Sequence, residues 1–374
     1  MLKNILVPKQ YSLAATFGLD QKQVDPSIMV TGYEIPDPAT LDPSIAPHAQ
    51  FLLTLIPKID PMYQFRQDLI RDIYYWWVSG EDVLMLWGPT GSGKTSVWEQ
   101  WCARLGIPMA TMKGHRDFKD HEAFGQMGLV NSNTVFTPGP MTLAAQYGIP
   151  VICNEYDRIP PAKAIGFNDV FEGRPFPVPG NHSQMVTPQL GFRPVITANT
   201  NLVEDVSGNY GTASSHDVSL LERIYAMQVG YPERAAEQAL LQNVLAVYDD
   251  KLLSYWFDQE GMKVKTALGM KTGSAISRAE FIDALIDVAQ AIRTQSKDGG
   301  NTSDAALERT MSTRILRKWA VHSVRHAKAP EKLGKSGLHI ALDKYLASLA
   351  TESTRIALHQ AVEMVFGVGE VVAA

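Results

Sequence analysis

The sequence predicts an α/β protein in which a doubly wound, mostly parallel sheet is followed by an all-helical domain. The first indication lies at residues 83–105, where a short apolar run, a glycine-rich loop and a segment with helical spacing follow one another. Short apolar segments then alternate with helical ones as far as about Tyr231, the pattern of repeated strand–helix–strand units. Beyond Pro232 the character changes, and the segments with helical character are 233–260, 277–294, 304–327 and 338–366.

These changes predict three regions in the 374-residue chain. Residues 1–60 are rich in proline, aspartate and other polar residues, so we expect few periodic elements and an extended segment that packs on the core. Residues 61–232 should form the α/β domain, which opens with a helix over Tyr63–Trp77. Residues 233–374 should form the helical domain, with an exposed loop at Thr294–Thr302. The predicted strands are Val83–Trp87, Pro108–Met112, Pro150–Asn154, Val195–Ala198 and Ala226–Val229.

The glycine-rich loop has the sequence of a phosphate-binding loop. Between a strand and a helix N-terminus, its glycines free backbone N–H groups to cradle phosphates. Lys94 would reach the β- and γ-phosphates, and the Thr95 hydroxyl would ligate Mg²⁺. The chain is therefore expected to bind ATP with Mg²⁺. The residues expected to hold them are Gly88, Pro89, Thr90, Gly91, Ser92, Gly93, Lys94, Thr95 and Ser96.

Composition narrows the class of protein. An apolar content of 45% and a charged content of 20% are ordinary for a globular chain. The net charge of −5 lacks the basic footprint of a nucleic-acid-binding protein. No apolar run approaches the roughly 18 residues that a membrane span needs, and the N-terminus lacks a secretion signal, so we expect a cytoplasmic protein without a membrane partner. Cys102 and Cys153 lie in predicted core elements, which suits buried thiols in a reducing compartment.

Two further predicted strands end in polar residues that could contact Mg²⁺, the phosphates or the attacking water. The strand over 150–154 ends in Asn154-Glu155, where a Walker B element belongs. The first residue of that element normally helps to hold Mg²⁺, and the second orients the attacking water. Because Asn154 supplies an amide in place of a carboxylate, we expect weaker Mg²⁺ affinity or slower hydrolysis, with Glu155 as the catalytic carboxylate. Asn199 ends the following strand and can hydrogen-bond the γ-phosphate or the water, since ligands of open α/β sheets lie at the carboxyl edge.

Two arginines are candidates for further contacts with the nucleotide. Arg223 lies at the end of a predicted helix, before the last predicted strand, where its planar charged fork could point into a neighbouring subunit's ATP site. Arg314 begins a helix of the C-terminal domain, from which it could reach back over the nucleotide. A surface arginine–glutamate pair at 223 and a solvated helix arginine at 314 are the structural alternatives.

With these motifs in place, the chain resembles the MoxR-type AAA+ ATPases, and among them the CobS-like ATPase subunits of cobaltochelatases. The resemblance covers nearly the whole chain. The chain differs from the family at Asn154 and in the sequence of the phosphate loop, GPTGSGKT. It also differs in residues 162–190, which occupy the position of the family's hairpin insert but diverge from it in detail. The matching motifs are Phe17–Asp20, Pro57–Phe65, Phe136–Pro140, Asn154–Asp157, Thr197–Thr200, Gly208–Thr212, Ser312–Arg314 and Val365–Gly367.

The resemblance implies an AAA+ core with a helical lid, assembled as a ring that is typically hexameric. It also implies a partner with a von Willebrand factor A domain (CobT-like) and an ATP cycle that remodels a target, which in cobaltochelatase is the subunit that inserts cobalt into a corrin ring. The roles carried over by position are phosphate and Mg²⁺ binding for Lys94 and Thr95, catalysis for Glu155, sensor 1 for Asn199, the trans-acting finger for Arg223 and sensor 2 for Arg314.

Two other function classes stay open at this point. A DNA-directed AAA+ ring, helicase-like or loader-like, would need a basic pore, and the candidate residues for it also suit a solvated loop. An ATP-binding scaffold with little hydrolysis is the third hypothesis, because Asn154 removes a carboxylate that holds Mg²⁺. The basic candidates are Lys113, His115, Arg116 and Lys119.

Overall fold

The computed structural model describes residues 5–22, 24–80, 83–130, 132–203, 205, 210, 213, 215–216, 218–248, 277–297, 306–326 and 335–367. The described residues form two compact units. The first contains those up to Gly88, those from Gly93 to Asp205 and those from Tyr210 to Val229. The second contains Pro89–Ser92 and the described residues from Gly230 onward.

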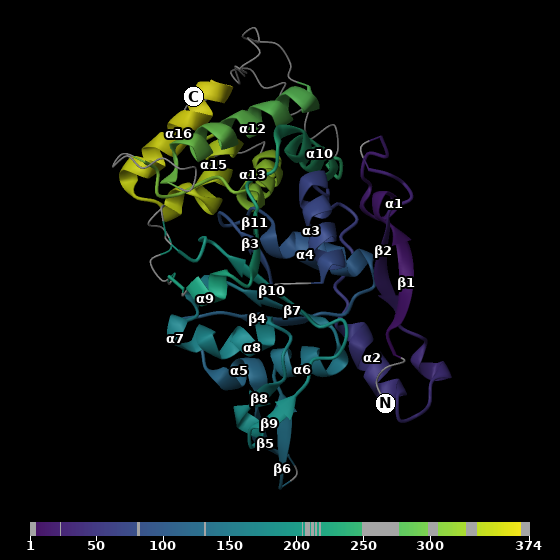
Figure 1. The fold of residues 1–374 in the computed structure, drawn as a ribbon. Helices are drawn as coiled ribbons and strands as arrows, with labels where there is room; N and C mark the ends of the chain where they lie inside the picture. The colour runs from purple at the N-terminus through teal and green to yellow at the C-terminus, as the bar shows by residue number, and fades with distance from the viewer. Residues whose placement is uncertain are drawn as a thin grey trace. The chain divides into compact units, whose positions relative to one another are not determined.

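The first unit is built around a five-stranded parallel sheet (Figure 1). Each predicted strand is present, and two of them, Val83–Trp87 and Pro150–Asn154, have the predicted bounds. The other three are shifted by one or two residues at their ends. This sheet confirms the predicted α/β fold class. Its strand order is β11 (Ile224–Gln228), β3 (Val83–Trp87), β10 (Arg193–Ala198), β7 (Pro150–Asn154) and β4 (Ala110–Lys113).

Side chains alternate between the two faces of the sheet, because successive residues of a strand point to opposite sides. Leu84 and Leu86 pack with helices α3 (Gln67–Ser79) and α4 (Lys94–Arg104), whereas Val83 and Met85 pack with the opposite set. Figure 1 shows α3 and α4 on one face and α5 to α8 on the other. The sheet is therefore buried on both faces, as a doubly wound fold requires.

Helix α3 begins four residues later than the predicted helix. Tyr63 and Phe65 lie before its first turn and pack against each other, with ring centroids 4.8 Å apart. Trp76 of α3 and Trp98 of α4 then meet edge to face at 5.7 Å, and both are fully buried. Aromatic side chains bury large apolar areas, so this pair fixes the two helices on their side of the sheet.

Residues 5–54 contain more regular structure than the sequence predicts. Strands β1 (Val7–Ser12) and β2 (Met29–Glu34) form an antiparallel pair, and helices α1 (Leu13–Phe17) and α2 (Ala46–Thr54) accompany them. The segment packs on the core as expected. Tyr33 N donates to Leu105 O at 2.9 Å, and a Cβ at Gly32 would lie 2.2 Å from that same oxygen. Only a residue without a side chain allows β2 to approach the end of α4 so closely.

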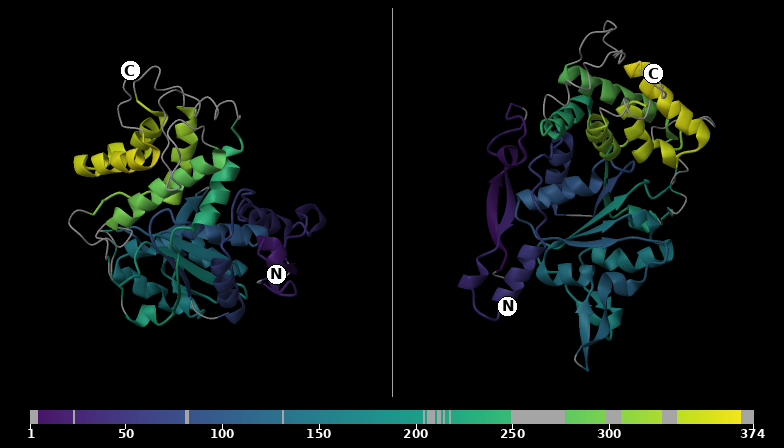
Figure 2. Two further views of the ribbon diagram at one scale, coloured as in Figure 1. Left: turned by 90° about the horizontal axis from the view of Figure 1, so that it is seen from above. Right: turned by 180° about the vertical axis from the view of Figure 1, so that it is seen from behind.

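Two small hairpins lie on the opposite side of the sheet from α3 and α4. The first, β5 (Gly125–Val130) with β6 (Asn133–Pro138), stands between α5 (Asp120–Phe124) and α6 (Pro140–Tyr147) and projects away from the sheet (Figure 2). The second hairpin is β8 (Phe176–Val178) with β9 (Gln184–Val186), and it lies in residues 162–190, where the sequence predicts the hairpin insert. Two short helices precede it, α7 (Pro161–Ala164) and α8 (Asn168–Phe171).

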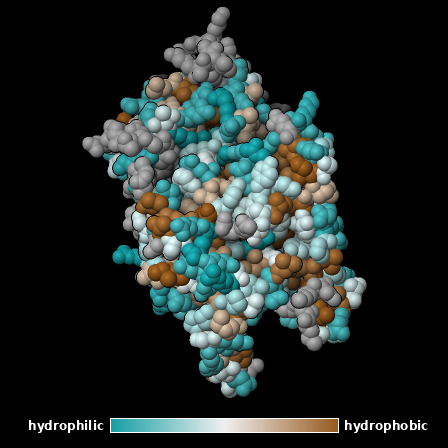
Figure 3. All heavy atoms as spheres, viewed as in Figure 1, coloured by the Kyte–Doolittle hydropathy of each residue, from teal (hydrophilic) through white to brown (hydrophobic). Residues whose placement is uncertain are grey.

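Exposed apolar residues are dispersed over the surface that Figure 3 shows, in small groups among hydrophilic ones. The hairpin β5–β6 carries three of them, with Leu129 78% exposed, Val135 44% and Met127 37%. Isolated surface apolar residues are ordinary in globular proteins. Among the described residues, no helix is both long enough and apolar enough to cross a bilayer.

The second unit is helical in its described part from Gly230 onward. Phe281, Trp319 and Phe366 are fully buried and come from three different helices of its core. The segment 338–366, predicted to be mostly helical, contains two helices, and residues 298–302 of the predicted loop lie outside the described residues. The helices are α10 (Arg234–Leu245), α12 (Arg278–Gln295), α13 (Thr313–Arg325), α15 (Gly337–Tyr345) and α16 (Glu352–Phe366).

Candidate functional site

The phosphate loop connects β3 to α4, as its sequence predicts. Gly88 has φ +145° and a Cβ there would lie 2.4 Å from Val229 O, so the chain can pass β11 only with glycine at this position. Gly93 has φ +100° and directly precedes α4, and a Cβ there would meet no atom within 4 Å. Glycine is thus needed at 93 for the backbone conformation, and the open space beside it leaves the N-terminus of α4 accessible to phosphate.

Lys94 and Asn199, which are 105 residues apart, meet at the carboxyl edge of the sheet. The Lys94 ammonium donates to Gly88 O at 2.7 Å and to Asn199 Oδ1 at 3.1 Å, and the lysine is only 9% exposed. Both of these acceptors are neutral oxygens, and an ammonium group forms stronger hydrogen bonds with the anionic oxygens of a phosphate. The two residues assigned to phosphate contact are therefore close together.

Thr95 and Asn154 form the second contact between the predicted motifs. Thr95 Oγ1 donates to Asn154 Oδ1 at 2.6 Å, and Thr197 Oγ1 donates to the same oxygen at 3.2 Å. The Asn154 amide thus accepts hydrogen bonds as a carboxylate would, although it lacks the negative charge. Hydroxyl and amide oxygens are ligands that suit Mg²⁺, a hard cation that usually keeps several of its waters. Thr95 and Asn154 fit such an ion, with one formal charge fewer than a carboxylate would supply.

Glu155 lies immediately after β7, in a left-handed conformation with φ 55° and ψ 44°. Its carboxylate forms ion pairs with Lys113 at 3.0 Å and with Arg158 at 2.9 Å. Its backbone N–H donates to Thr197 Oγ1 at 3.3 Å. Non-glycine residues adopt this conformation rarely, and it occurs most often where surrounding contacts fix it, as they do here.

Asp157 is a functional candidate to which the sequence assigns no role. It is 1% exposed, and its Oδ2 accepts hydrogen bonds from the backbone N–H of Asn199 at 2.8 Å and of Thr200 at 3.3 Å. Burial raises the pKa of this carboxyl, while those two hydrogen bonds oppose the increase. Asp157 therefore fixes the backbone from which the Asn199 side chain reaches Lys94. Its place in the Asn154–Asp157 motif was the only signal in the sequence.

Arg223 lies at the other edge of the sheet. Its carbonyl accepts a hydrogen bond from Val83 N, at the start of β3, at 2.9 Å, whereas the phosphate loop follows the far end of that strand. The arginine is paired with a glutamate, but the partner is Glu172 and not the adjacent Glu222. A five-residue strand separates the two edges by roughly 15 Å. Arg223 therefore does not join Lys94 in the site of its own chain.

Arg314 and the tip of the phosphate loop, Pro89–Ser92, belong to the second unit. Arg314 is an exposed residue in the first turn of α13, whose N-cap Ser312 accepts from Ile315 N at 3.3 Å. A Cβ at Gly91 would lie 2.7 Å from Ser312 Oγ and 3.8 Å from Arg314 Cβ. The start of α13 thus lies beside Gly91, and the sensor 2 role of Arg314 stays a prediction.

The remaining predicted residues are placed as follows. Ser92 is buried, and Ser96 is half-buried in the first turn of α4. Cys102 and Cys153 are buried free thiols, as expected, and burial raises the pKa of both. Most of the motif Gly208–Thr212 lies outside the described residues.

The basic cluster proposed for a DNA pore is partly neutralised. Lys113 forms its ion pair with Glu155 at 3.0 Å, and His115 lies 2.8 Å from a Glu122 oxygen. A basic footprint needs cations that are free to face phosphates. The arrangement therefore gives the DNA-directed alternative no further support.

Comparisons with known proteins agree with this geometry. Residues 83–213 match the AAA domain of the dynein-related subfamily. The chain is 23% identical over 231 residues to the gas vesicle ATPase GvpN2 of Halobacterium salinarum, which covers 56% of this chain and 65% of the relative. It is 25% identical over 170 residues to the protein NorQ of Paracoccus denitrificans, covering 46% and 60%. It is 26% identical over 159 residues to the aerobic cobaltochelatase subunit CobS of a Sinorhizobium species, covering 41% and 48%.

The resemblance inferred from the motifs is thereby confirmed, since these relatives are AAA+ ATPases of the MoxR type and CobS is among them. The chain spans less than two thirds of the length of each of the three relatives. The relatives include a gas vesicle ATPase and a cobaltochelatase subunit, so the shared domain does not identify a single client or pathway.

Proposed function

Residues 83–213 are an AAA domain of the dynein-related subfamily, and from that premise we propose that the chain is an ATP-hydrolysing motor of the MoxR type. The chain assembles as a ring, which we propose is a hexamer, and it uses ATP to remodel a partner protein complex. The observation that supports this most directly is the convergence at one sheet edge, where Lys94 contacts Asn199 and Thr95 contacts Asn154. Phosphate loop, Walker B position and sensor 1 position thus occupy one site.

In this proposal each residue has a separate task. Lys94 exchanges its two neutral oxygen partners for phosphate oxygens, and the gain in charge interaction binds the triphosphate. Thr95 holds Mg²⁺ directly and Asn154 holds it through a bound water. The ion neutralises charge on the phosphates when it is bound. Glu155 orients the attacking water, Asn199 contacts the γ-phosphate, and Asp157 keeps Asn199 in place.

The two remaining arginines complete the site from outside the sheet edge. Arg223 acts on the nucleotide of a neighbouring subunit, because it lies at the opposite edge from its own Lys94. Arg314 acts as sensor 2 from the start of α13. Planar guanidinium groups suit both tasks, since they donate paired hydrogen bonds to phosphoryl oxygens.

The partner is the least determined part of the proposal. The relatives are a gas vesicle ATPase, NorQ and a cobaltochelatase subunit, so a metal chelatase is one version of the client and another complex is a second. In either version, a subunit with a von Willebrand factor A domain (CobT-like) couples ATP hydrolysis by the ring to the remodelling of the client. The gene next to this one distinguishes them, because a chelatase large subunit encoded there would favour the first version.

A scaffold that binds ATP without turnover is the second candidate. It is favoured by the neutral Asn154 amide and by the two ion pairs that hold Glu155. Phosphate release by the purified protein with ATP and Mg²⁺ decides between the two, with Lys94→Ala as the matched control. We expect turnover in the wild type, none in Lys94→Ala, and stable ATP-bound rings in Glu155→Gln. Equal phosphate release from wild type and Lys94→Ala, with or without candidate partners, would refute the motor and leave the scaffold.

A further inference from the structure

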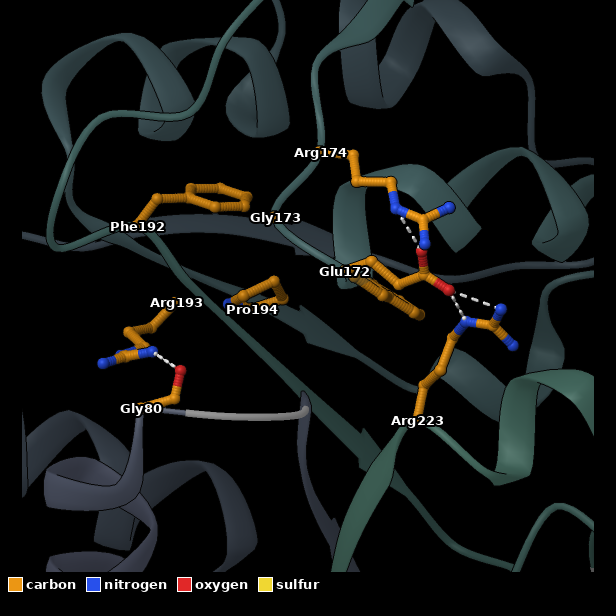
Figure 4. Close-up of a pocket in the computed structure, with 9 residues that line it drawn as sticks. Gly80, Glu172, Gly173, Arg174, Phe192, Arg193, Pro194 and Arg223 are labelled. Carbon is orange, nitrogen blue, oxygen red and sulfur yellow. Dashed lines mark hydrogen bonds and ion pairs between the residues drawn. The ribbon is translucent and has the colours of Figure 1, made fainter.

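Arg223 lines a cavity at the amino edge of the sheet. The cavity has a volume of about 400 Å³ and is lined by residues of the first unit. Among them are three arginines, Arg174, Arg193 and Arg223, and one carboxylate, Glu172 (Figure 4). Three guanidinium groups and one carboxylate therefore line the cavity. The arginines that form an ion pair with Glu172 are the ones whose orientation it can fix.

Glu172 divides its two oxygens between two of the arginines. Oε2 lies 2.7 Å from Arg174 Nε, and Oε1 accepts from Arg223 Nε at 2.5 Å and also contacts Arg223 Nη2. Figure 4 shows the carboxylate between these two guanidinium groups, with Arg193 across the cavity and turned towards Gly80. Arg193 Nη1 donates to the Gly80 carbonyl. One oxygen of Glu172 therefore contacts Arg223, and the ion pair of the other oxygen with Arg174 restricts the orientation of the carboxylate.

The contacts of Arg223 involve all three nitrogens of its guanidinium group. Glu172 accepts a hydrogen bond from Nε and forms an ion-pair contact with Nη2, and the carbonyl of Ser219 in α9 (Val218–Leu221) accepts a hydrogen bond from Nη1. A guanidinium group has five N–H donors in a rigid fork. At the end of the side chain, one N–H of Nη1 and one N–H of Nη2 point in parallel. A parallel pair of N–H groups is the arrangement that binds phosphate oxygens two at a time.

The backbone of Arg223 is fixed as firmly as its side chain. Its N–H donates to Leu220 O at 3.0 Å and its carbonyl accepts from Val83 N at 2.9 Å, so the residue is anchored to β3. The side chain is 28% exposed, and that of Glu172 is 20% exposed. The ion pair is therefore partly shielded from water, where charge interactions are less screened than at an open surface.

We infer that Glu172 is a positioning residue for Arg223, which it holds so that the end pair of N–H groups faces a phosphoryl oxygen of the nucleotide bound by a second copy of this chain. The inference rests on the proposed function, since it needs a triphosphate in the neighbouring site. It assigns to Glu172 no contact with the nucleotide. Its effect passes entirely through the orientation of Arg223.

The test compares Glu172→Ala and Glu172→Gln with the matched control Glu222→Gln, an exposed glutamate next to Arg223 in sequence. We expect Glu172→Ala to lower kcat about tenfold or more, because an unheld guanidinium loses orientation, while the Kd for ATP with Mg²⁺ changes less than about twofold, because the phosphate loop is untouched. Glu172→Gln keeps one acceptor oxygen and should fall between Glu172→Ala and wild type. Glu222→Gln should match wild type in both constants.

Mixed rings separate positioning from a general structural effect. A Glu172→Ala subunit has an intact phosphate loop, and a Lys94→Ala subunit has an intact Glu172 and Arg223. We expect each variant alone to be impaired and their mixture to hydrolyse ATP faster than the sum of the two. A mixture of Arg223→Ala with Lys94→Ala sets the benchmark for such recovery. Particle mass under the same conditions shows that every variant assembles equally.

The outcomes distinguish the inference from the function on which it rests. Wild-type kcat in Glu172→Ala, with Arg223→Ala inactive, would overturn the inference and leave the motor standing. Recovery in the Arg223→Ala mixture but none in the Glu172→Ala mixture would also overturn it, because the defect would then lie within the altered subunit. Full activity in Arg223→Ala would refute the finger itself, and absence of turnover in the wild type would refute the motor.

Discussion

Asn154 is the residue at which the candidate site departs from the usual Walker B pattern. Its amide oxygen accepts from Thr95 at 2.6 Å and from Thr197 at 3.2 Å, so the geometry of a Walker B residue is kept without its charge. A hydrogen bond to a charged acceptor is stronger than one to a neutral acceptor by about 1 kcal/mol. We therefore expect the amide to lower the affinity for Mg²⁺ relative to a carboxylate of the same shape.

Asn154→Asp should lower the Mg²⁺ concentration needed for half-maximal ATP hydrolysis. A carboxylate keeps both hydroxyl contacts and adds one negative charge, and about 1 kcal/mol corresponds to roughly a fivefold shift. Phosphate release measured across a Mg²⁺ titration at saturating ATP checks this. Asn154→Leu serves as the control, because it removes both hydrogen bonds and should be impaired at every Mg²⁺ concentration. Superimposable titrations of Asn154→Asp and wild type would show that the missing charge has no effect.

The sequence predicted Asn154, Glu155 and Asn199 because each ends an apolar strand whose boundaries are visible in the residue pattern. It assigned no role to Asp157 or Glu172, for a physical reason. The role of Asp157 depends on a short turn that brings it to the end of a strand 42 residues later, and Glu172 meets Arg223 across 51 residues. Contacts between residues so far apart in sequence follow from tertiary packing, which no local pattern records.

His216 gives the first unit a pH dependence. It is 9% exposed and stacks on Tyr156 with ring centroids 5.4 Å apart. Among the described residues neither of its ring nitrogens has a hydrogen-bond partner. Burial lowers the pKa of His216 to about 4, from an ordinary value of 6.5. Between those two values the unfolded chain binds the proton and the folded protein does not, so stability falls as pH decreases through this window.

His216→Phe should reduce this loss of stability on acidification. Phenylalanine keeps the stacking on Tyr156 and has no nitrogen to protonate, so unfolding near pH 5 should take up about one proton fewer than in wild type. Denaturant unfolding at intervals from pH 4 to pH 7 measures the slope. The two proteins should run parallel above about pH 7 and diverge below it. Parallel curves over the whole range would mean that His216 is protonated equally in the folded and unfolded protein.

At the scale of elements, the parts that sequence patterns located well are those whose boundaries are set locally. Strands β3 and β7 end where apolar runs meet Gly88 and Glu155. The sequence pattern did not predict the pairing of β1 with β2. The paired residues, for example Gln10 and Thr31, are separated by α1 and by a polar segment that contains proline. A strand whose partner lies that far away shows only weak alternation of its own.

Three helices of the second unit are joined by one buried ion pair. Glu237 of α10 is fully buried and accepts two hydrogen bonds from Arg293 of α12, at 2.7 and 2.8 Å. Arg293 Nε also donates to Met311 O at 2.7 Å, and Thr313 of α13 donates to Glu237 at 3.0 Å. The start of α13, which carries Arg314, is therefore anchored through this pair.

Glu237→Gln should destabilise the second unit strongly. Removing one partner leaves the charge of Arg293 buried without compensation, which typically costs about 3–5 kcal/mol. Replacing both residues, as in Glu237→Leu with Arg293→Met, should recover most of that loss, because no uncompensated charge remains. Glu352→Gln is the matched control, since its pair with Arg355 is exposed and should leave the unfolding midpoint unchanged. Equal midpoints for Glu237→Gln and Glu352→Gln in urea unfolding would refute the role of the pair.

At the scale of the whole molecule, the sheet separates the two groups of residues to which the proposed motor assigns catalytic roles. β10 shows this within a single strand, because it begins at Arg193, beside the cavity of Arg223, and ends next to Asn199, beside Lys94. In the proposed motor, a protomer therefore carries a nucleotide site at one edge and a finger for another site at the opposite edge. Neither half completes the other within one chain, so catalysis in this arrangement requires copies joined head to tail.

This division predicts that ATP turnover per protomer rises with protein concentration. Below the concentration at which rings form, Lys94 and Glu155 lack a neighbour's arginine, a contact worth about 10³ to 10⁵ in kcat in related phosphoryl-transfer enzymes. We expect wild-type turnover to fall at least about tenfold on dilution, and Arg223→Ala to stay low at every concentration while binding ATP normally. Phosphate release across a dilution series, with particle mass measured at each step, checks both. Constant turnover through the dissociation of the particles would mean that each protomer is complete, and the finger would then have to be sought within the same chain.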